Sequence, residues 1–303
     1  MPVPVPLALI LISIALMPGS PDAGQAERVL PAGPRPVVNW PVILGNSIRY
    51  TPAVADIDGD GRDEIAVSTK DCRAFLLDWR GESLPGWPVE TDALINRALL
   101  LDDIDGDARF EVAGATTDRL LHLWGTEGIE LAGWPVELAG NAASAPLLIR
   151  DRNTGRRSIL ISTWPGGVCL FSPGGDVREG WPKLLEQSTN SGSADNFPTC
   201  VADLDRDGTP EVMHLTTQPP VLYCWRIDGS ADPGFPVEIE GDGGLGLAVD
   251  DPKTPRHIAL TTRDLLFVID LETGLELRKI GGVAGDEFVT APFFTGEEGL
   301  LMT

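Results

Sequence analysis

Four Trp-Pro pairs recur at one fixed spacing along the chain. Trp40, Trp87, Trp134 and Trp181 are each followed by proline and stand 47 residues apart, in the phrases NWPVIL, GWPVET, GWPVEL and GWPKLL. A fifth copy, GFPVEI, places Phe235 54 residues after Trp181, which indicates an insertion in that unit. Chance does not set four Trp-Pro pairs on one period. The chain is therefore built from repeats, each a supersecondary unit that packs against its neighbours.

Each unit contains short apolar runs separated by Gly, Asp and Pro turns. In the first unit the runs are 52–55, 64–68 and 74–79, and a fourth follows Trp87 and its proline. Runs of this length are too short for helices and are typical of strands. Four strands in about 47 residues, repeated, predict an all-β fold, a β-propeller of four-stranded blades.

The repeat also predicts where the blades begin and end. We expect five full blades and a partial sixth, at approximately 45–91, 92–138, 139–185, 186–239, 240–281 and 282–303. The phrase VVNWPVIL near the N-terminus is a lone final strand with no blade before it, as in a strand that closes a ring. We therefore expect a fragment of a six- or seven-bladed ring. The rival is an open stack of five blades, which leaves unpaired edges that proteins usually avoid.

Residues 1–26 have the features of a secretory signal peptide. The apolar run 6–17, PLALILISIALM, is shorter than the roughly 20 residues that span a bilayer, and breakers and a small-residue cleavage site after Ala23 or Ala26 follow it. The alternative is a buried core segment of an intracellular protein. On the first interpretation, 27–36 is a linker, 37–303 is the propeller, and the mature protein is secreted, periplasmic or at the cell surface, with no membrane span.

Charge and cysteine content narrow the classes of partner. The formal charge of −22 argues against nucleic acid and anionic lipid, which reward clustered Lys and Arg, and it suits cation binding. The four cysteines show no C-x-x-C spacing, so no zinc site is indicated. One pair could form a disulfide in an oxidising compartment, but single buried thiols are the favoured interpretation.

Three units carry a nine-residue acidic loop after their first strand, with the sequences DIDGDGRDE, DIDGDARFE and DLDRDGTPE. In such a tight loop the carboxylates at positions 1, 3, 5 and 9 converge, and the backbone carbonyl at position 7 faces the same way. Hard oxygen ligands in this number suit Ca²⁺, which accepts six to eight, better than Mg²⁺ with its strict octahedron. The expected carboxylate ligands are Asp56, Asp58, Asp60, Glu64, Asp103, Asp105, Asp107, Glu111, Asp203, Asp205, Asp207 and Glu211, with the backbone carbonyls of Arg62, Arg109 and Thr209.

The plainer interpretation is that Asp-Gly pairs only make hairpin turns. A turn needs one such pair, whereas these loops place four carboxylates within nine residues, a repulsive arrangement without a cation. The second loop is the weakest candidate, because Ala108 stands where the chain favours a glycine with positive φ. The aligned segments of the third and fifth units, 150–157 and 250–256, have lost the ligand pattern.

At these residues the chain resembles the FG-GAP/VCBS repeat family, whose best-known members are the seven-bladed propellers of integrin α chains. The matching core is A-D-x-D-G-D-G-x-x-E-[IV] in units one, two and four, apart from Asp102 and Ala108 in unit two and Arg206 in unit four. The resemblance covers about 37–303, with units three and five matching in strand pattern only. The resemblance implies calcium loops on one rim of a propeller that serves as a binding or scaffold platform. It does not imply a particular partner.

Two functional classes remain open. We expect a non-catalytic module for binding, adhesion or scaffolding, with an extracellular protein, a glycan or a downstream domain of the same chain as partner. The alternative is a secreted polysaccharide lyase or hydrolase, but the chain has only two tyrosines and no catalytic motif. His122, His214 and His257 lack the spacing of a metal or catalytic site, and the periodic tryptophans are expected to pack between blades and not to stack on sugars.

Overall fold

The computed structural model describes residues 39–165, 167–185, 199–217, 219–241, 243–251, 255–262, 265–271, 276–281, 292–294 and 300–302. Within these ranges the chain forms strands, turns and bends, and no helix. The predicted signal peptide 1–26 and linker 27–36 lie outside the described residues. In the described part, no helix has the length and apolar character that a membrane crossing requires.

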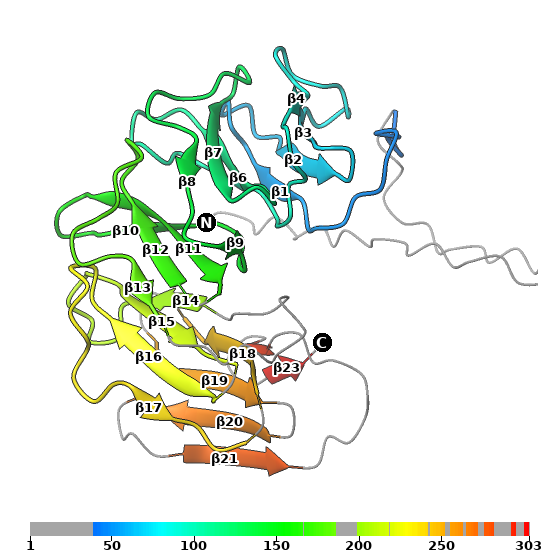
Figure 1. Cartoon of the computed structure of the whole chain (residues 1–303). Helices are drawn as coiled ribbons and strands as arrows, with labels where there is room; N and C mark the ends of the chain where they lie inside the picture. The colour runs from blue at the N-terminus through cyan, green and yellow to red at the C-terminus, as the bar shows by residue number, and fades with distance from the viewer. Residues whose placement is uncertain are drawn as a thin grey trace, which may run out of the picture. The chain divides into compact units, whose positions relative to one another are not determined.

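Strands pair in antiparallel sheets that follow the order of the chain, and each sheet can be traced by its labels in Figure 1. Sheet one comprises β1 (Ala53–Ala55), β2 (Glu64–Thr69), β3 (Arg73–Leu77) and β4 (Val89–Glu90). Sheet two comprises β5 (Leu100–Asp102), β6 (Glu111–Ala115), β7 (Leu120–Gly125) and β8 (Val136–Glu137). Sheet three comprises β10 (Leu147–Arg150), β11 (Arg157–Trp164), β12 (Gly167–Phe171) and β13 (Lys183–Leu184), with β9 (Asn141–Ala142) paired to β11.

The remaining sheets continue the same order. Sheet four comprises β14 (Thr199–Ala202), β15 (Glu211–Leu215), β16 (Val221–Trp225) and β17 (Val237–Glu238). Sheet five comprises β18 (Gly244–Val249), β19 (His257–Thr262), β20 (Leu265–Asp270) and β21 (Glu276–Gly281). A two-stranded sheet of β22 (Pro292–Phe294) and β23 (Leu300–Met302) follows. The all-β class and the four-stranded sheets are thus as predicted, while the blade boundaries and the blade number of a full ring stay predictions.

The hydrophobic core lies between successive sheets. Alternate residues of β3 point to opposite faces, so that Leu76 joins the cluster shared with sheet two while Phe75 joins a separate cluster with Val67. Three further clusters join sheet two to three, three to four and four to five. Successive sheets therefore cover one another's apolar faces, as in a repeat architecture.

Three of the four periodic tryptophans take part in these inter-sheet clusters, as predicted, while Trp40 is half-buried and lies outside them. Trp87, Trp134 and Trp181 are each at most 8% exposed. Their indole N–H groups donate to backbone carbonyls of the next sheet's hairpin turn, as Trp134 does to Pro173 at 2.8 Å. The equivalent bonds run from Trp87 to Thr126 and from Trp181 to Ile227, both at 2.8 Å. A ring buried between sheets with its one donor satisfied is a structural element.

The cysteines are single thiols in the described structure. Cys169 and Cys224 are buried, Cys72 and Cys200 are half-buried, and none forms a disulfide. Burial raises the pKa of the Cys169 thiol to about 11, so that this thiol stays protonated and unreactive at neutral pH.

Candidate metal-binding loops

Each acidic loop connects the first and second strands of its sheet, and its last residue begins the second strand. Glu64, Glu111 and Glu211 are the first residues of β2, β6 and β15 and are at most 4% exposed. Their side chains fold back onto the start of the loop. Glu111 Oε2 accepts the backbone N–H of Ile104 at 2.7 Å, and Glu64 and Glu211 accept the equivalent N–H groups at 3.1 and 2.8 Å.

The residue at position 2 anchors each loop in the core. Ile104 is fully buried in the cluster between sheets two and three, and the side chains of Ile57 and Leu204 pack against the equivalent clusters. The apolar side chain therefore points inward while its N–H points to the glutamate. The sequence contains this signal as the Ile or Leu between the first two aspartates, a position that the pattern of oxygen ligands does not include.

Backbone N–H groups fix the remaining carboxylates. In the first loop, Asp56 accepts from Gly59 at 2.8 Å and from Gly61 at 2.9 Å, and Asp58 accepts from Asp60 at 3.0 Å. Asp60 in turn accepts from Arg62 at 2.8 Å. The other two loops repeat the bonds from position 5 to position 3 and from position 7 to position 5. These bonds wind the loop tightly and gather the carboxylates.

The result is three groups of carboxylates that could hold a metal ion. In each group one oxygen from position 1, one from position 3 and one from position 9 lie within 4.8 Å of one another. The groups are Asp56, Asp58 and Glu64; Asp103, Asp105 and Glu111; and Asp203, Asp205 and Glu211. The position 5 carboxylates, Asp60, Asp107 and Asp207, are not part of these groups. Those aspartates and the carbonyls of Arg62, Arg109 and Thr209 stay predicted ligands.

The turn at position 6 requires a positive φ in all three loops. Gly61 and Gly208 have φ of 83° and 92°, and Ala108 adopts the same conformation at 71°. A side chain there costs about 1–2 kcal/mol relative to glycine. Position 4 is also left-handed, including Arg206 at 61°, a conformation that the ligand pattern does not predict.

Burial among like charges raises the pKa of the position 9 glutamates. The pKa of Glu111 and of Glu211 rises from 4.5 to about 7, mainly because burial disfavours the charged form and also because neighbouring aspartates repel it. The N–H groups of Ile104 and Leu204 oppose this rise. Without a cation, these two loops hold their glutamates in an environment that favours protonation.

This gives a pH dependence for the metal-free protein. Because the folded pKa lies above the unfolded value, proton binding stabilises the fold, and that stability is lost as pH rises from about 4.5 through about 7. We expect the melting temperature in chelator to fall between about pH 5 and about pH 8, and the fall to be shallower in Glu111→Gln. Thermal melts at several pH values measure both. An identical pH slope in the wild type and the variant would contradict this assignment.

The third loop contains an unsatisfied buried oxygen. Asp203 is 6% exposed, and its Oδ2 accepts the N–H of Gly208 at 3.0 Å. Its Oδ1 has no hydrogen-bond partner among the described residues. A buried carboxylate oxygen without a partner is costly, and a cation held with Asp205 and Glu211 would satisfy it.

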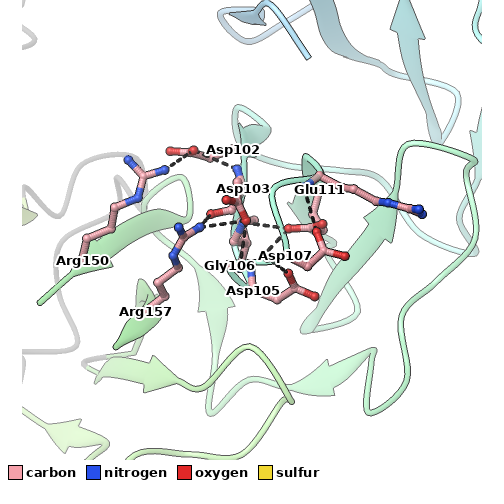
Figure 2. Close-up of polar contacts among 10 residues, drawn as sticks. Asp102, Asp103, Asp105, Gly106, Asp107, Glu111, Arg150 and Arg157 are labelled. Atoms are coloured by element: carbon pink, nitrogen blue, oxygen red, sulfur yellow. Dashed lines mark hydrogen bonds and ion pairs between the residues drawn. The ribbon is translucent and has the colours of Figure 1, made fainter. Parts of the chain in front are cut away.

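Residues of the third unit, where the ligand pattern is lost, contact the acidic loops on both sides. Arg157 pairs with Asp103 of the second loop, and Arg150 pairs with the adjacent Asp102 (Figure 2). Asn153 Nδ2 donates to the carbonyl of Asp207 in the third loop at 2.8 Å. In the sequence these arginines stand only at positions where ligands are lost. The signal present in the sequence is the change from acidic to basic residues at the aligned positions of unit three, and it does not identify the loops that these residues contact.

The histidines contact structural residues. His122 Nδ1 lies 2.6 Å from Glu130 Oε1, and its ring stacks on Trp124 with centroids 5.0 Å apart. His214 is buried, and burial lowers its pKa to about 4, so that it stays neutral at physiological pH. His257 lies 2.9 Å from Asp250 in the fifth unit. No metal-ligating group among the described residues includes a histidine.

No protein-family model and no curated protein matches this chain. Solved structures match it by fold. BBS1N, in its complex with ARL6DN, is 12% identical with a TM-score of 0.55, over 85% of this chain and 77% of that one. The computationally designed Ika8 protein is 16% identical with a TM-score of 0.56, over 84% and 67%. The V. cholerae biofilm matrix protein Bap1 is 16% identical with a TM-score of 0.53, over 79% and 40%.

Identities this low show the fold alone. Together with the succession of four-stranded antiparallel sheets, they define a β-propeller-like protein. Its distinguishing feature is a set of three clusters, each of three carboxylates, that could bind metal ions.

Proposed function

We propose that this chain is a secreted, calcium-binding propeller of the FG-GAP/VCBS type, which acts as a non-catalytic module for binding, adhesion or scaffolding. The acidic loops hold Ca²⁺, and the ions make the loops rigid. A rigid loop presents a preformed surface to an extracellular protein or glycan, which lowers the entropy cost of binding.

The observation that carries the calcium assignment is the Asp203 carboxylate. Its Oδ1 is buried without a partner in the described structure, within a group that already contains Asp205 and Glu211. Three carboxylates that converge in a low-dielectric site repel one another unless a cation joins them. Oxygen ligands alone, with no sulfur or nitrogen, favour Ca²⁺ over transition metals.

Thermal melts of the chain in millimolar calcium, in EDTA, and in EDTA with magnesium restored test this assignment. Extracellular sites with dissociation constants of about 10⁻⁴ to 10⁻³ M would stabilise by roughly 0.4 to 1.4 kcal/mol each in millimolar calcium. For a protein of this size, each kcal/mol of stabilisation raises the melting temperature by about 2–4 °C. We expect a calcium-specific rise that Asp205→Ala reduces. Melts that do not change on chelation would mean that the loops are only turns.

The binding role needs its own measurement. The immobilised chain would be probed with extracellular proteins and glycans, once in calcium and once in EDTA. We expect capture of a partner in calcium and its release on chelation. The biofilm matrix protein Bap1 shares the fold, and a matrix role is compatible with a binding module. Turnover of a polysaccharide by the chain would instead place it among enzymes.

A further inference from the structure

The second acidic loop differs from the other two because an arginine lies against it. Arg157, the first residue of β11 in sheet three, places its Nη1 2.8 Å from Asp103 Oδ1 and also donates to the Asp103 backbone carbonyl. The two side chains are 24% and 17% exposed, so the pair is largely shielded from water. The arginine also packs closely on the loop, because a Cβ added at Gly106 would lie 3.3 Å from Arg157 Nε.

The position 1 aspartates of the other loops have different partners. Gly61 and Gly208 donate to the second oxygen of Asp56 and Asp203, at 2.9 and 3.0 Å. In the second loop Ala108 replaces that glycine, and Asp103 forms an ion pair with the guanidinium of Arg157. Within the described part of the chain, no ion pair reaches the grouped carboxylates of the first or third loop.

Part of the negative charge at the second loop is neutralised from within the chain. A guanidinium is positively charged at every physiological pH and is a good partner for a carboxylate. It neutralises one of the three carboxylates in the group of Asp103, Asp105 and Glu111. Arg150 pairs with Asp102 immediately before the loop, which removes a further negative charge from the surroundings (Figure 2).

We propose that Arg157 takes the place of the cation at the second loop, so that this loop keeps its form without calcium and binds calcium only when the guanidinium is displaced. An ion held by Asp103, Asp105 and Glu111 would have to approach the fixed positive charge that already pairs with Asp103 Oδ1. The inference rests on the proposed function for its contrast with the first and third loops. It predicts that the chain binds two calcium ions, at the first and third loops, where the motif alone predicts three.

Calcium titration calorimetry on the whole chain tests the stoichiometry. We expect the wild type to bind two ions and Arg157→Met to bind three, because methionine keeps an apolar stem and removes the charge. Arg150→Met is the matched control, since Arg150 pairs with Asp102 outside the carboxylate group, and it should still bind two. Three equivalent ions in the wild type, or no gain in Arg157→Met, would overturn the inference.

A variant in which the first and third loops each lose one aspartate ligand measures calcium binding at the second loop alone. In Asp58→Ala/Asp205→Ala we expect calcium affinity to be at least about tenfold weaker than at the wild-type sites, and Arg157→Met added to it should recover that factor. Binding at wild-type affinity in the double variant would contradict the inference. If the double variant does not fold, the single-variant stoichiometry still decides.

A metal-free measurement separates this inference from the proposed function. In EDTA, the double-mutant cycle of Asp103→Asn and Arg157→Met measures the coupling between the two side chains by denaturant unfolding. Coupling in EDTA together with no calcium binding by any loop would overturn the proposed function and leave the Arg157–Asp103 pairing standing. An additive cycle would overturn the inference whatever the other loops bind.

Discussion

Replacing Trp134 by alanine is expected to lower the free energy of unfolding by about 3–5 kcal/mol, as for other large aromatic side chains removed from a core. Trp134 is 8% exposed, and its ring lies 6.3 Å from that of Phe171 between sheets two and three. Its removal leaves a cavity between the sheets and leaves the Pro173 carbonyl without the indole donor. Urea unfolding followed by circular dichroism measures the change.

The matched control is Trp134→Phe. It keeps an aromatic ring and loses only part of the volume and the N–H donor, so a loss of about 1–2 kcal/mol is expected. The chain itself shows that a phenylalanine is tolerated, because Phe235 takes the aligned position in the unit that carries the insertion. Equal losses in the two variants would mean that the ring contributes little and that the donor dominates.

Much of the fold could be predicted because it repeats. A core position that recurs every 47 residues, such as Trp87 and Trp134, must face an equivalent neighbour, and short apolar runs between Gly and Asp turns leave few choices other than strands. The β class and the four-stranded sheets follow from this local pattern. The number of blades in a ring does not, because it depends on small rotations between units that no local pattern specifies.

The candidate site could be predicted only as far as its local geometry. The spacing of Asp103, Asp105 and Glu111 specifies a tight loop, and the structure brings these side chains together. The spacing does not specify which residues of a neighbouring unit lie against the loop. Arg157 is 54 residues from Asp103, and it meets that aspartate only because sheet three packs beside sheet two. Contacts between units of a repeat are invisible when one unit is aligned on another.

The third unit is an example of contacts that an alignment of the units does not reveal. Aligned on the acidic loops, its segment 150–157 looks like a loop that has lost its function. In the structure, Arg157 contacts the loop before it, and Asn153 contacts the loop after it, donating to Asp207 and to Thr209 Oγ1. A unit without ligands of its own therefore supplies polar contacts to both neighbours.

Replacing Gly86 by alanine is the second substitution with a large expected effect. Gly86 has φ of 87°, and a Cβ there would lie 1.9 Å from the carbonyl oxygen of Glu127 in the hairpin turn of sheet two. Gly128 in that turn is positioned reciprocally, since its own Cβ would lie 2.3 Å from the Gly86 carbonyl oxygen. The atoms that an added Cβ would meet at Gly86 and at Gly128 are backbone atoms. The clash therefore cannot be relieved by a change of side-chain rotamer.

The expected loss for Gly86→Ala is about 2–5 kcal/mol, of which about 1–2 come from the left-handed conformation and about 1–3 from the forced separation of the two backbones. Gly155→Ala is the control, because Gly155 has φ of 69° and nothing within 4 Å of its added Cβ, so it should lose only the conformational part. Equal losses would show that the sheets do not meet at these glycines. A larger loss at Gly86 would explain why glycine precedes Trp87, Trp134 and Trp181: the tryptophan reaches the next sheet's turn only if the residue before it lets the two backbones touch.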